Sequence, residues 1–157
     1  MERTKLKLIL ILTIIISLFI TIYLLDRYSS VNNQPYKRVK INNHRLNVEI
    51  VSDNLTRAKG LSNRKSLDKN SGMLFMFPNA DYHQFWMKDM LFPLDFIWIK
   101  DNIVVDVTEN VAYPINHDEN MSIITPKEPA NTVLEVNAGK IKEWDIKIGD
   151  VVEDNFN

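Results

Sequence analysis

Three side chains with the chemistry to hold a polar ligand, Trp86, Lys88 and Asp95, fall in one short window of the sequence. Period-two alternation puts Trp86 and Lys88 on the same face of a predicted strand over residues 84–88. Asp95 begins a second predicted strand, residues 94–100, whose two faces are both apolar, so its carboxylate is buried and needs a partner. An indole can stack on a sugar or peptide. We therefore hypothesise a cleft in which the three side chains converge on a ligand.

Three basic residues could supply the positive charge that partners Asp95: Lys88, Arg57 and Arg64. The two arginines could also line an anion-binding pocket near the aromatic strand, although ordinary surface arginines explain them as well. The competing interpretation of Asp95 is structural, as an ion pair or a cap that fixes the preceding turn. The ligand-binding candidates are therefore Trp86, Lys88, Asp95, Arg57 and Arg64, and no catalytic residue is identified.

Composition removes several classes of function. A net charge of -1 over 157 residues argues against a nucleic-acid partner, which favours a basic excess. The absence of cysteine excludes disulfides, thiolate zinc sites and cysteine nucleophiles. His44, His83 and His117 are widely spaced, without a metal-ligand pattern. We expect no metal and no cofactor.

Catalysis is a less favoured interpretation of the same residues than ligand binding. The serines lie in no Gly-x-Ser-x-Gly elbow. Paired carboxylates could cleave a glycoside, and Asp95, Asp106 and Glu109 are candidates, but the last two fit an exposed hairpin face better. Three classes stay open: a ligand- or partner-binding module, which we favour, an enzyme acting on an envelope component such as a glycan, and a purely structural scaffold.

The elements that position this window are short and strand-rich. Alternation and turn residues predict strands at 39–41, 46–50, 73–77, 84–88, 94–100, 103–111, 132–136 and 151–152, with a long loop over 112–130. We predict an α+β fold that is mainly antiparallel β, a small barrel-like domain with two short helices.

The two helices are predicted from their end signals. Asp53 suits an N-cap for a helix over 54–61, and Gly60 lies near its end. Within it, apolar positions including Leu55 fall on one face. Asn137 can cap a second helix, which carries Ile141.

The N-terminal segment differs from the rest of the chain. Residues 8–25 carry no charge and, as a helix, would extend about 27 Å, close to the hydrocarbon core of a bilayer. Arg3, Lys5 and Lys7 precede this run, which favours a cytoplasmic N-terminus. A cleaved signal peptide is the alternative, but no Ala-x-Ala site follows.

These signals divide the chain into three parts. We expect residues 1–30 to be a single-pass transmembrane signal-anchor, 31–36 a linker, and 37–157 an extracytoplasmic β-rich domain. The expected partners are the membrane, through residues 8–25, and an envelope glycan or protein.

Several strings in the soluble part resemble one family. They are Gly60-Leu61, Arg64, Leu67, Gly72-Met73-Leu74-Phe75, Phe85-Trp86-Met87-Lys88, Pro93-Leu94-Asp95, Val133-Leu134-Glu135-Val136, Ala138-Gly139 and Ile148-Gly149-Asp150. Together they resemble domain-of-unknown-function family 192 (uncharacterised protein family 0127) over about residues 45–153. Asp89-Met90 replaces the family's common Asn-Thr, and Ser62 its frequent Met. The resemblance implies a small β-rich domain, often exported or membrane-anchored, and no established reaction.

Overall fold

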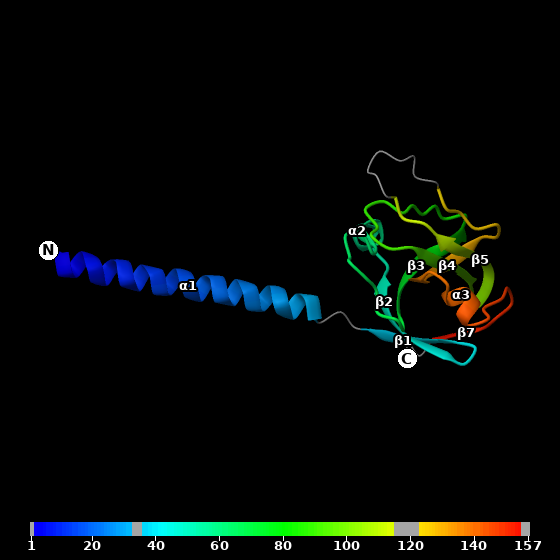
Figure 1. Ribbon diagram of the computed structural model, residues 1–157, viewed down its shortest axis with the longest axis horizontal. Coiled ribbons are helices and arrows are strands. Elements are labelled where there is room, and N and C mark those ends of the chain that lie inside the picture. Colours follow the sequence, from blue (N-terminus) through cyan, green and yellow to red (C-terminus); the bar gives the residue numbers. More distant parts are fainter. Residues whose placement is uncertain (1, 33–35, 115–122, 155–157) are drawn as a thin grey trace. The chain divides into compact units, whose positions relative to one another are not determined.

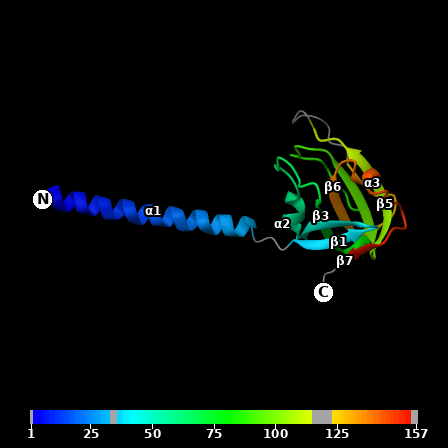
Figure 2. The same cartoon turned by 60° about the horizontal axis from the view of Figure 1, so that its bottom comes forward.

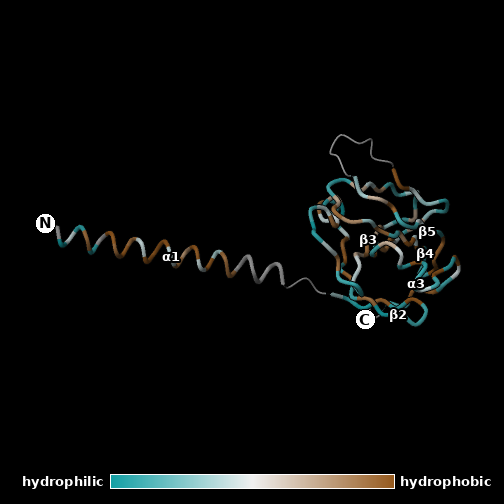
Figure 3. Tube along the Cα trace, in the orientation of Figure 1, coloured by the Kyte–Doolittle hydropathy of each residue, from teal (hydrophilic) through white to brown (hydrophobic). Residues whose placement is uncertain are grey.

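The computed structural model describes residues 2–32, 36–114 and 123–154. The chain divides into two compact units, Met1–Pro35 and Tyr36–Asn157. The first holds one helix, α1 (Glu2–Asn32), and Figure 3 shows hydrophobic residues along most of it. Within α1, Arg3–Leu25 is long and apolar enough to cross a membrane by length and composition. The expected apolar helix is therefore present, and it includes residues 8–25.

The second unit is built on one sheet. Within the described residues its seven strands are β1 (Lys37–Ile41), β2 (His44–Val51), β3 (Ser71–Asp81), β4 (Leu94–Lys100), β5 (Ile103–Val111), β6 (Ala130–Asn137) and β7 (Val152–Asp154). Their order across the sheet is β5-β4-β6-β3-β2-β1-β7. Neighbours are antiparallel except β2 and β3, which run parallel. The mainly antiparallel α+β prediction is confirmed.

The sheet curls into a half-barrel. Its edge strands approach each other at an antiparallel bridge between Ile103 and Val151. Figure 1 shows the strands curving around α3 (Lys140–Glu143), while α2 (Asn54–Lys59) lies outside the curve beside β3. The turned view in Figure 2 again places α2 beside β3 and α3 beside β5. The sheet thus has an inner face, toward α3, and an outer face, toward α2.

Each face of the sheet carries its own apolar core. The inner core consists of Val39, Ile41, Leu46, Val48, Leu74, Ile97, Ile99, Val104, Leu134, Val136, Ile141, Trp144, Ile146 and Val152. The outer core consists of Val51, Leu61, Met73, Phe75, Met87, Met90, Leu94, Phe96, Trp98, Ile124, Ala130 and Val133. Successive residues of β4 and β6 alternate between the two cores, because side chains of a strand point to opposite faces. These central strands are therefore buried on both sides.

The predicted strand over residues 84–88 is wrong. Among the described residues this segment joins no strand ladder, pairs through one isolated bridge between Phe85 and Ile124, and enters a turn at Lys88. The alternation that suggested a strand is nevertheless real, since Met87 is buried while Trp86 and Lys88 are exposed. Packing of one side against the outer core produces a period of two without strand pairing.

The predicted start and end signals are confirmed for α2 and wrong for α3. The carboxylate of Asp53 accepts hydrogen bonds from Leu55 and Thr56 amides at the start of α2, and Gly60 ends the helix. Of the expected apolar face, Leu55 is exposed and α2 buries none of its own residues, whereas Leu61, just after the helix, is buried. Arg57 of α2 also donates to the carbonyls of Ser52 and Met76, so polar contacts help to hold the helix.

Asn137 is not the N-cap of α3. Gly139 occupies that position and offers no side-chain cap, while the Asn137 amide donates to the carbonyls of Leu67 and Asp68. The missing acceptor comes from β4: Asp95 Oδ2 accepts from the amide of Ile141 at 2.9 Å. A carboxylate distant in sequence thus serves the first turn of this helix.

Candidate functional site

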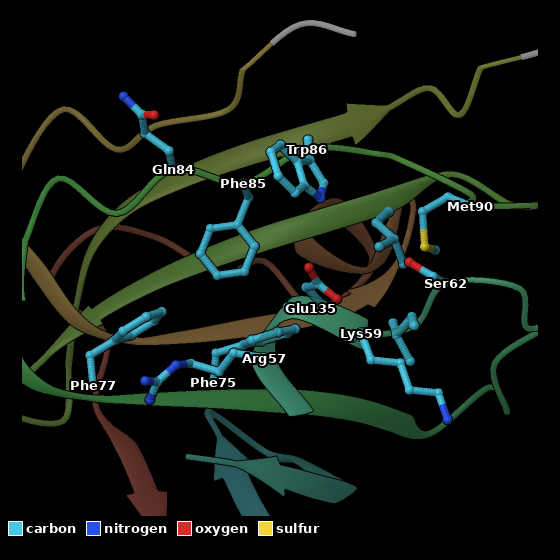
Figure 4. A pocket seen from close by; sticks show the side chains of 14 residues that line it. Arg57, Lys59, Ser62, Phe75, Phe77, Gln84, Phe85, Trp86, Met90 and Glu135 are labelled. Atoms are coloured by element: carbon cyan, nitrogen blue, oxygen red, sulfur yellow. The ribbon is translucent and has the colours of Figure 1, made fainter. Parts of the chain in front are cut away.

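A pocket of about 180 Å³ opens on the outer face of the sheet. It is lined by Arg57, Ala58, Lys59, Gly60, Leu61, Ser62, Phe75, Phe77, Gln84, Phe85, Trp86, Met90, Leu94 and Glu135 (Figure 4). The lining comes from the end of α2 and the turn after it, from β3, β4 and β6, and from the segment 84–90, which turns at Lys88–Asp89. We call this cavity the outer pocket.

Glu135 lies at the base of the outer pocket. On β6 it is paired with Met73 of β3 and with Phe96 of β4, both members of the outer core. Alternation along the strand sends Leu134 and Val136 inward and leaves Glu135 on the outer face beside apolar neighbours. Figure 4 shows its carboxylate directed toward Phe85 and Trp86. A charged group therefore sits where the surrounding strands supply apolar side chains.

The environment of Glu135 favours its protonated form. The side chain is 5% exposed, and no donor among the described residues hydrogen-bonds to its carboxyl. Burial raises the pKa of Glu135 to about 8, and the positive charge of Arg64 offsets this only in part. At pH 7 the group therefore holds a proton that an exposed glutamate would have lost.

Arg64 is committed to a different carboxylate. Its Nη1 and Nη2 donate to Glu49 Oε1 and Oε2 at 2.5 and 2.7 Å, a two-pronged ion pair. This hydrogen bonding raises the pKa of Arg64. Glu49 lies on β2, one strand beyond Met73, in the same row across the sheet as Glu135. Of the two acidic residues in this row, Glu49 thus has a cationic partner and Glu135 has none in contact among the described residues.

Aromatic rings form one wall of the outer pocket. Phe75 and Phe85 meet edge to face with ring centroids 4.9 Å apart. Phe77 and Phe85 are also edge to face, with ring centroids 6.3 Å apart. Gly60 brings the backbone close to this wall, since a Cβ at that position would lie 3.4 Å from Phe75 Cζ. Its φ of +48° further favours glycine.

Trp86 stands at the mouth of the outer pocket, with 59% of its surface exposed. Its neighbours hold it there: Phe85 bridges to Ile124 through two backbone hydrogen bonds of 2.8 and 2.9 Å, and Met87 is buried. An exposed indole fixed between two anchored residues can stack on a ligand without a large ordering cost.

Arg57 lines the outer pocket but is fully engaged. Its Nη1 donates to the carbonyls of Ser52 and Met76, its Nη2 donates to Asn54 Oδ1, and the guanidinium lies 4.8 Å from the Phe77 ring centroid. These contacts tie α2 to β3. Arg57 therefore builds the pocket wall.

The structure separates the five residues singled out from the sequence. Trp86 and Arg57 line the outer pocket, whereas Lys88, Arg64 and Asp95 do not. The Lys88 side chain is exposed, and its carbonyl accepts from the hydroxyl of the lining residue Ser62 at 3.0 Å.

The expected cationic partner of Asp95 is wrong. Asp95 is buried as predicted, but its Oδ1 accepts from the amide of Asn110 at 2.7 Å and its Oδ2 from the amide of Ile141 at 2.9 Å. None of the ion pairs among the described residues includes it. Two backbone amides satisfy the carboxylate, which supports the structural interpretation of this residue.

Sequence reasoning missed Glu135. The signal was available, because Glu135 interrupts the apolar string Val133–Val136 as Asp95 interrupts residues 94–99. What the sequence could not supply was the difference in their surroundings, one carboxylate meeting amides and the other meeting a cavity.

The histidines are used in packing where the structure describes them. His44 stacks on Trp144 with centroids 5.3 Å apart, and His83 stacks on Phe77 at 3.6 Å. His117 lies outside the described residues, as does much of the predicted 112–130 loop.

The fold is a small half-barrel domain with a cavity on the outer face of its sheet, and an apolar helix precedes the domain in the sequence. Residues 37–153 match the family DUF192, "Uncharacterized ACR, COG1430", and the chain belongs to this family. No curated protein matches the chain.

Two solved structures are similar to the domain. One, from Sinorhizobium meliloti 1021, is described as a "putative transcription regulator"; it is 34% identical, with a TM-score of 0.69, over 76% of this chain and 95% of the other. The second is a protein of unknown function from Novosphingobium aromaticivorans DSM 12444, 30% identical, with a TM-score of 0.65, over 74% of this chain and 83% of the other. Neither comparison establishes a reaction.

Proposed function

We propose that this protein is a membrane-anchored, extracytoplasmic ligand-binding module whose ligand site is the outer pocket. The observation that carries the proposal is Glu135, an acidic residue that is 5% exposed, lines an aromatic cavity and has no hydrogen-bond partner for its carboxyl among the described residues. Its carboxyl opens only onto the cavity, so a ligand that enters can supply the hydrogen bond or charge that the protein does not.

The anchor forms the other half of the proposal. We propose that residues 1–30 are an uncleaved signal-anchor with a cytoplasmic N-terminus, that 31–36 are a linker, and that 37–157 lie outside. The basic residues before the apolar run support this orientation, since such residues are retained on the cytoplasmic side. A shortened chain free of membranes in cell fractionation would contradict it.

Within the site, Trp86 covers the mouth and Arg57 braces the wall. Arg64 acts on Glu135 through its charge without lining the cavity, and Asp95 acts from the opposite face by fixing β4 and α3. A larger ligand, such as an envelope glycan or a segment of a protein partner, would extend past Trp86 toward the exposed Lys88.

A binding role is favoured over hydrolysis by the lining itself. Glu135 could act as a proton donor at neutral pH, as a general acid must. Glycoside cleavage by the usual route needs a second carboxyl group, however, and Glu135 is the one acidic residue among those that line the pocket.

The function is tested with the full chain in a polyoxyethylene detergent, which carries neither sugar nor amine. Saturation-transfer NMR against a panel of monosaccharides, amino acids, alkylamines and carboxylates should detect at least one bound compound. Trp86→Ala should lose it, whereas Tyr82→Ala, an exposed aromatic that does not line the pocket, should keep it. The proposal is wrong if nothing in the panel binds, or if Trp86→Ala and Lys88→Ala leave every interaction unchanged.

A further inference from the structure

The outer pocket holds an acidic group that has no counter-ion of its own. Glu135 is the sole acidic lining residue, and its carboxyl is buried without a hydrogen bond among the described residues. Ionising such a group is costly unless a positive charge comes within contact distance. The pocket is therefore selective for a ligand that supplies that charge.

The cations around Glu135 are directed elsewhere. Arg64 is paired with Glu49, and the guanidinium of Arg57 donates to two carbonyls and an amide oxygen. Lys59 lines the pocket from α2, but Figure 4 shows its amine pointing away from Glu135. None of these three neutralises the carboxyl by contact.

The other elements around Glu135 bring no further charge into the cavity. On β3 and β4 its cross-strand partners are Met73 and Phe96. The covering segment 84–90 contains Lys88 and Asp89, and neither lines the pocket. Within the lining, the negative charge of an ionised Glu135 would be unopposed.

The walls suit the apolar part of a cation. Phe85 and Trp86 lie on the side to which the Glu135 carboxyl points, and Phe75 lines the pocket from the other side (Figure 4). Aromatic faces attract cations electrostatically and pack against methylene groups. A volume of about 180 Å³ admits a group of a few heavy atoms and excludes a large ligand from full burial.

We propose that the outer pocket binds a small alkylammonium group, with Glu135 as its counter-ion and the aromatic wall around its carbon chain. This inference rests on the proposed ligand-binding function and names its ligand class. The ammonium group belongs either to a free amine or to the aminoalkyl headgroup of a lipid.

Binding of such a cation is linked to a proton. In the free protein the buried Glu135 holds its proton up to a pKa of about 8, and a bound ammonium favours the ionised carboxylate. Binding below pH 8 therefore releases a proton. The affinity for the cation should rise about tenfold per pH unit below that value and level off above it.

The test uses the full chain in polyoxyethylene detergent, n-butylammonium as the probe and n-butanol as its neutral match. Titrations follow the indole N–H resonance of Trp86 from pH 6 to pH 9. Butylammonium should bind roughly 100-fold more tightly at pH 9 than at pH 6, and butanol should bind weakly with no pH dependence. Equal affinity for the two probes, or a flat profile for butylammonium, overturns the inference.

Two glutamine variants locate the effect. Glu135→Gln should lose the pH-dependent affinity for butylammonium and retain the weak affinity for butanol. Glu109→Gln, an exposed glutamate outside the lining, should behave as the wild type. An unchanged butylammonium profile in Glu135→Gln contradicts the proposal. If Glu135→Gln fails to fold, the wild-type pH profile alone decides.

Nanodiscs distinguish a lipid headgroup from a free amine as the source of the ammonium group. In phosphatidylglycerol nanodiscs with and without phosphatidylethanolamine, a headgroup ligand shifts the Trp86 resonance without added amine, whereas a free-amine ligand requires butylammonium.

Failure of this inference also differs from failure of the proposed ligand-binding function. Trp86-dependent binding of a neutral sugar with no response to butylammonium removes the inference alone, while no binding by any panel compound removes both.

Discussion

The two faces of the half-barrel treat a buried carboxyl in opposite ways. On the inner face Asp95 is 0% exposed, and each of its oxygens accepts a backbone amide. On the outer face Glu135 is 5% exposed and accepts nothing from the described residues. They stand on adjacent strands and differ by one step in register, since Asp95 pairs with Val136 and Phe96 with Glu135.

The difference separates a structural acid from a candidate functional one. Asp95 joins β4 to Asn110 of β5 and to the first turn of α3, so its carboxylate holds three elements together. The carboxyl of Glu135 hydrogen-bonds to none of the described residues, so its charge links no elements in that part of the chain. A buried ionisable group that stabilises nothing and faces a cavity is a good candidate for ligand recognition.

The largest effect is expected when the inner carboxyl is removed. Asp95→Ala leaves the buried amide of Ile141 and the part-buried amide of Asn110 without their acceptors, which should lower the free energy of unfolding by about 3 kcal/mol. Urea unfolding of the full chain in polyoxyethylene detergent measures it. A loss below about 1 kcal/mol would mean that the two faces do not differ in this way.

The outer carboxyl, Glu135, should make the free energy of unfolding fall as the pH rises. Its pKa is raised in the folded state, from 4.5 to about 8, so the folded chain binds more protons than the unfolded chain between these values. The stabilisation is therefore complete below pH 4.5 and lost as the pH rises through 8. Between pH 5.5 and 8.5 the expected loss is about 3 kcal/mol.

Glu135→Gln is the matched variant for this pH effect, because an uncharged amide of similar shape has no proton to lose. The fall in stability between pH 5.5 and 8.5 should disappear, and at high pH the variant should be more stable than the wild type. Parallel urea titrations at both pH values would show it. A wild-type pH dependence that survives in Glu135→Gln must come from another group.

A smaller effect is expected from the rim of the outer pocket. Trp86→Ala should weaken butylammonium binding at pH 9 by about tenfold, since one aromatic face is lost. Its stability should change little, because the side chain is mostly exposed. Ligand relaxation titrations give the affinity, with Tyr82→Ala as the control. Equal weakening in both variants would place the effect outside the pocket.

The smallest expected effect compares two glycines. Gly60 (φ +48°) and Gly139 (φ +86°) both have backbone conformations that disfavour other residues, so Gly60→Ala and Gly139→Ala should each cost about 1 kcal/mol. A Cβ on Gly139 meets nothing within 4 Å, whereas one on Gly60 lies 3.4 Å from Phe75 Cζ. Urea unfolding and butylammonium titrations should thus show similar stability losses, with weaker binding only in Gly60→Ala.

Local signals in the sequence predicted much of the fold. The bounds of β4 and β5 follow from apolar runs around the Asp101-Asn102 turn, and both residues adopt the positive φ that such a turn requires. The apolar N-terminal helix and the mainly antiparallel half-barrel were likewise predictable. Each depends on patterns that are continuous in the sequence.

The site depended on contacts that no local pattern encodes. Alternation over 84–88 predicted a strand, but it reflects packing of Phe85 and Met87 on the outer core. Burial of Asp95 could be predicted, whereas its amide partners lie on β5 and α3, far along the chain. Glu135 had the same sequence signal as Asp95, and only the tertiary structure distinguishes them.

The most direct test of this contrast is the pKa of Glu135 itself. Carbon-13 NMR of the glutamate carboxyl groups in the full chain, with the Glu135 signal assigned by its loss in Glu135→Gln, follows the titration between pH 3 and pH 10. We predict a midpoint near 8, set by burial without a hydrogen-bond partner. A midpoint near the ordinary value of 4.5 would show that the outer carboxyl is as well satisfied as the inner one, and would contradict the account.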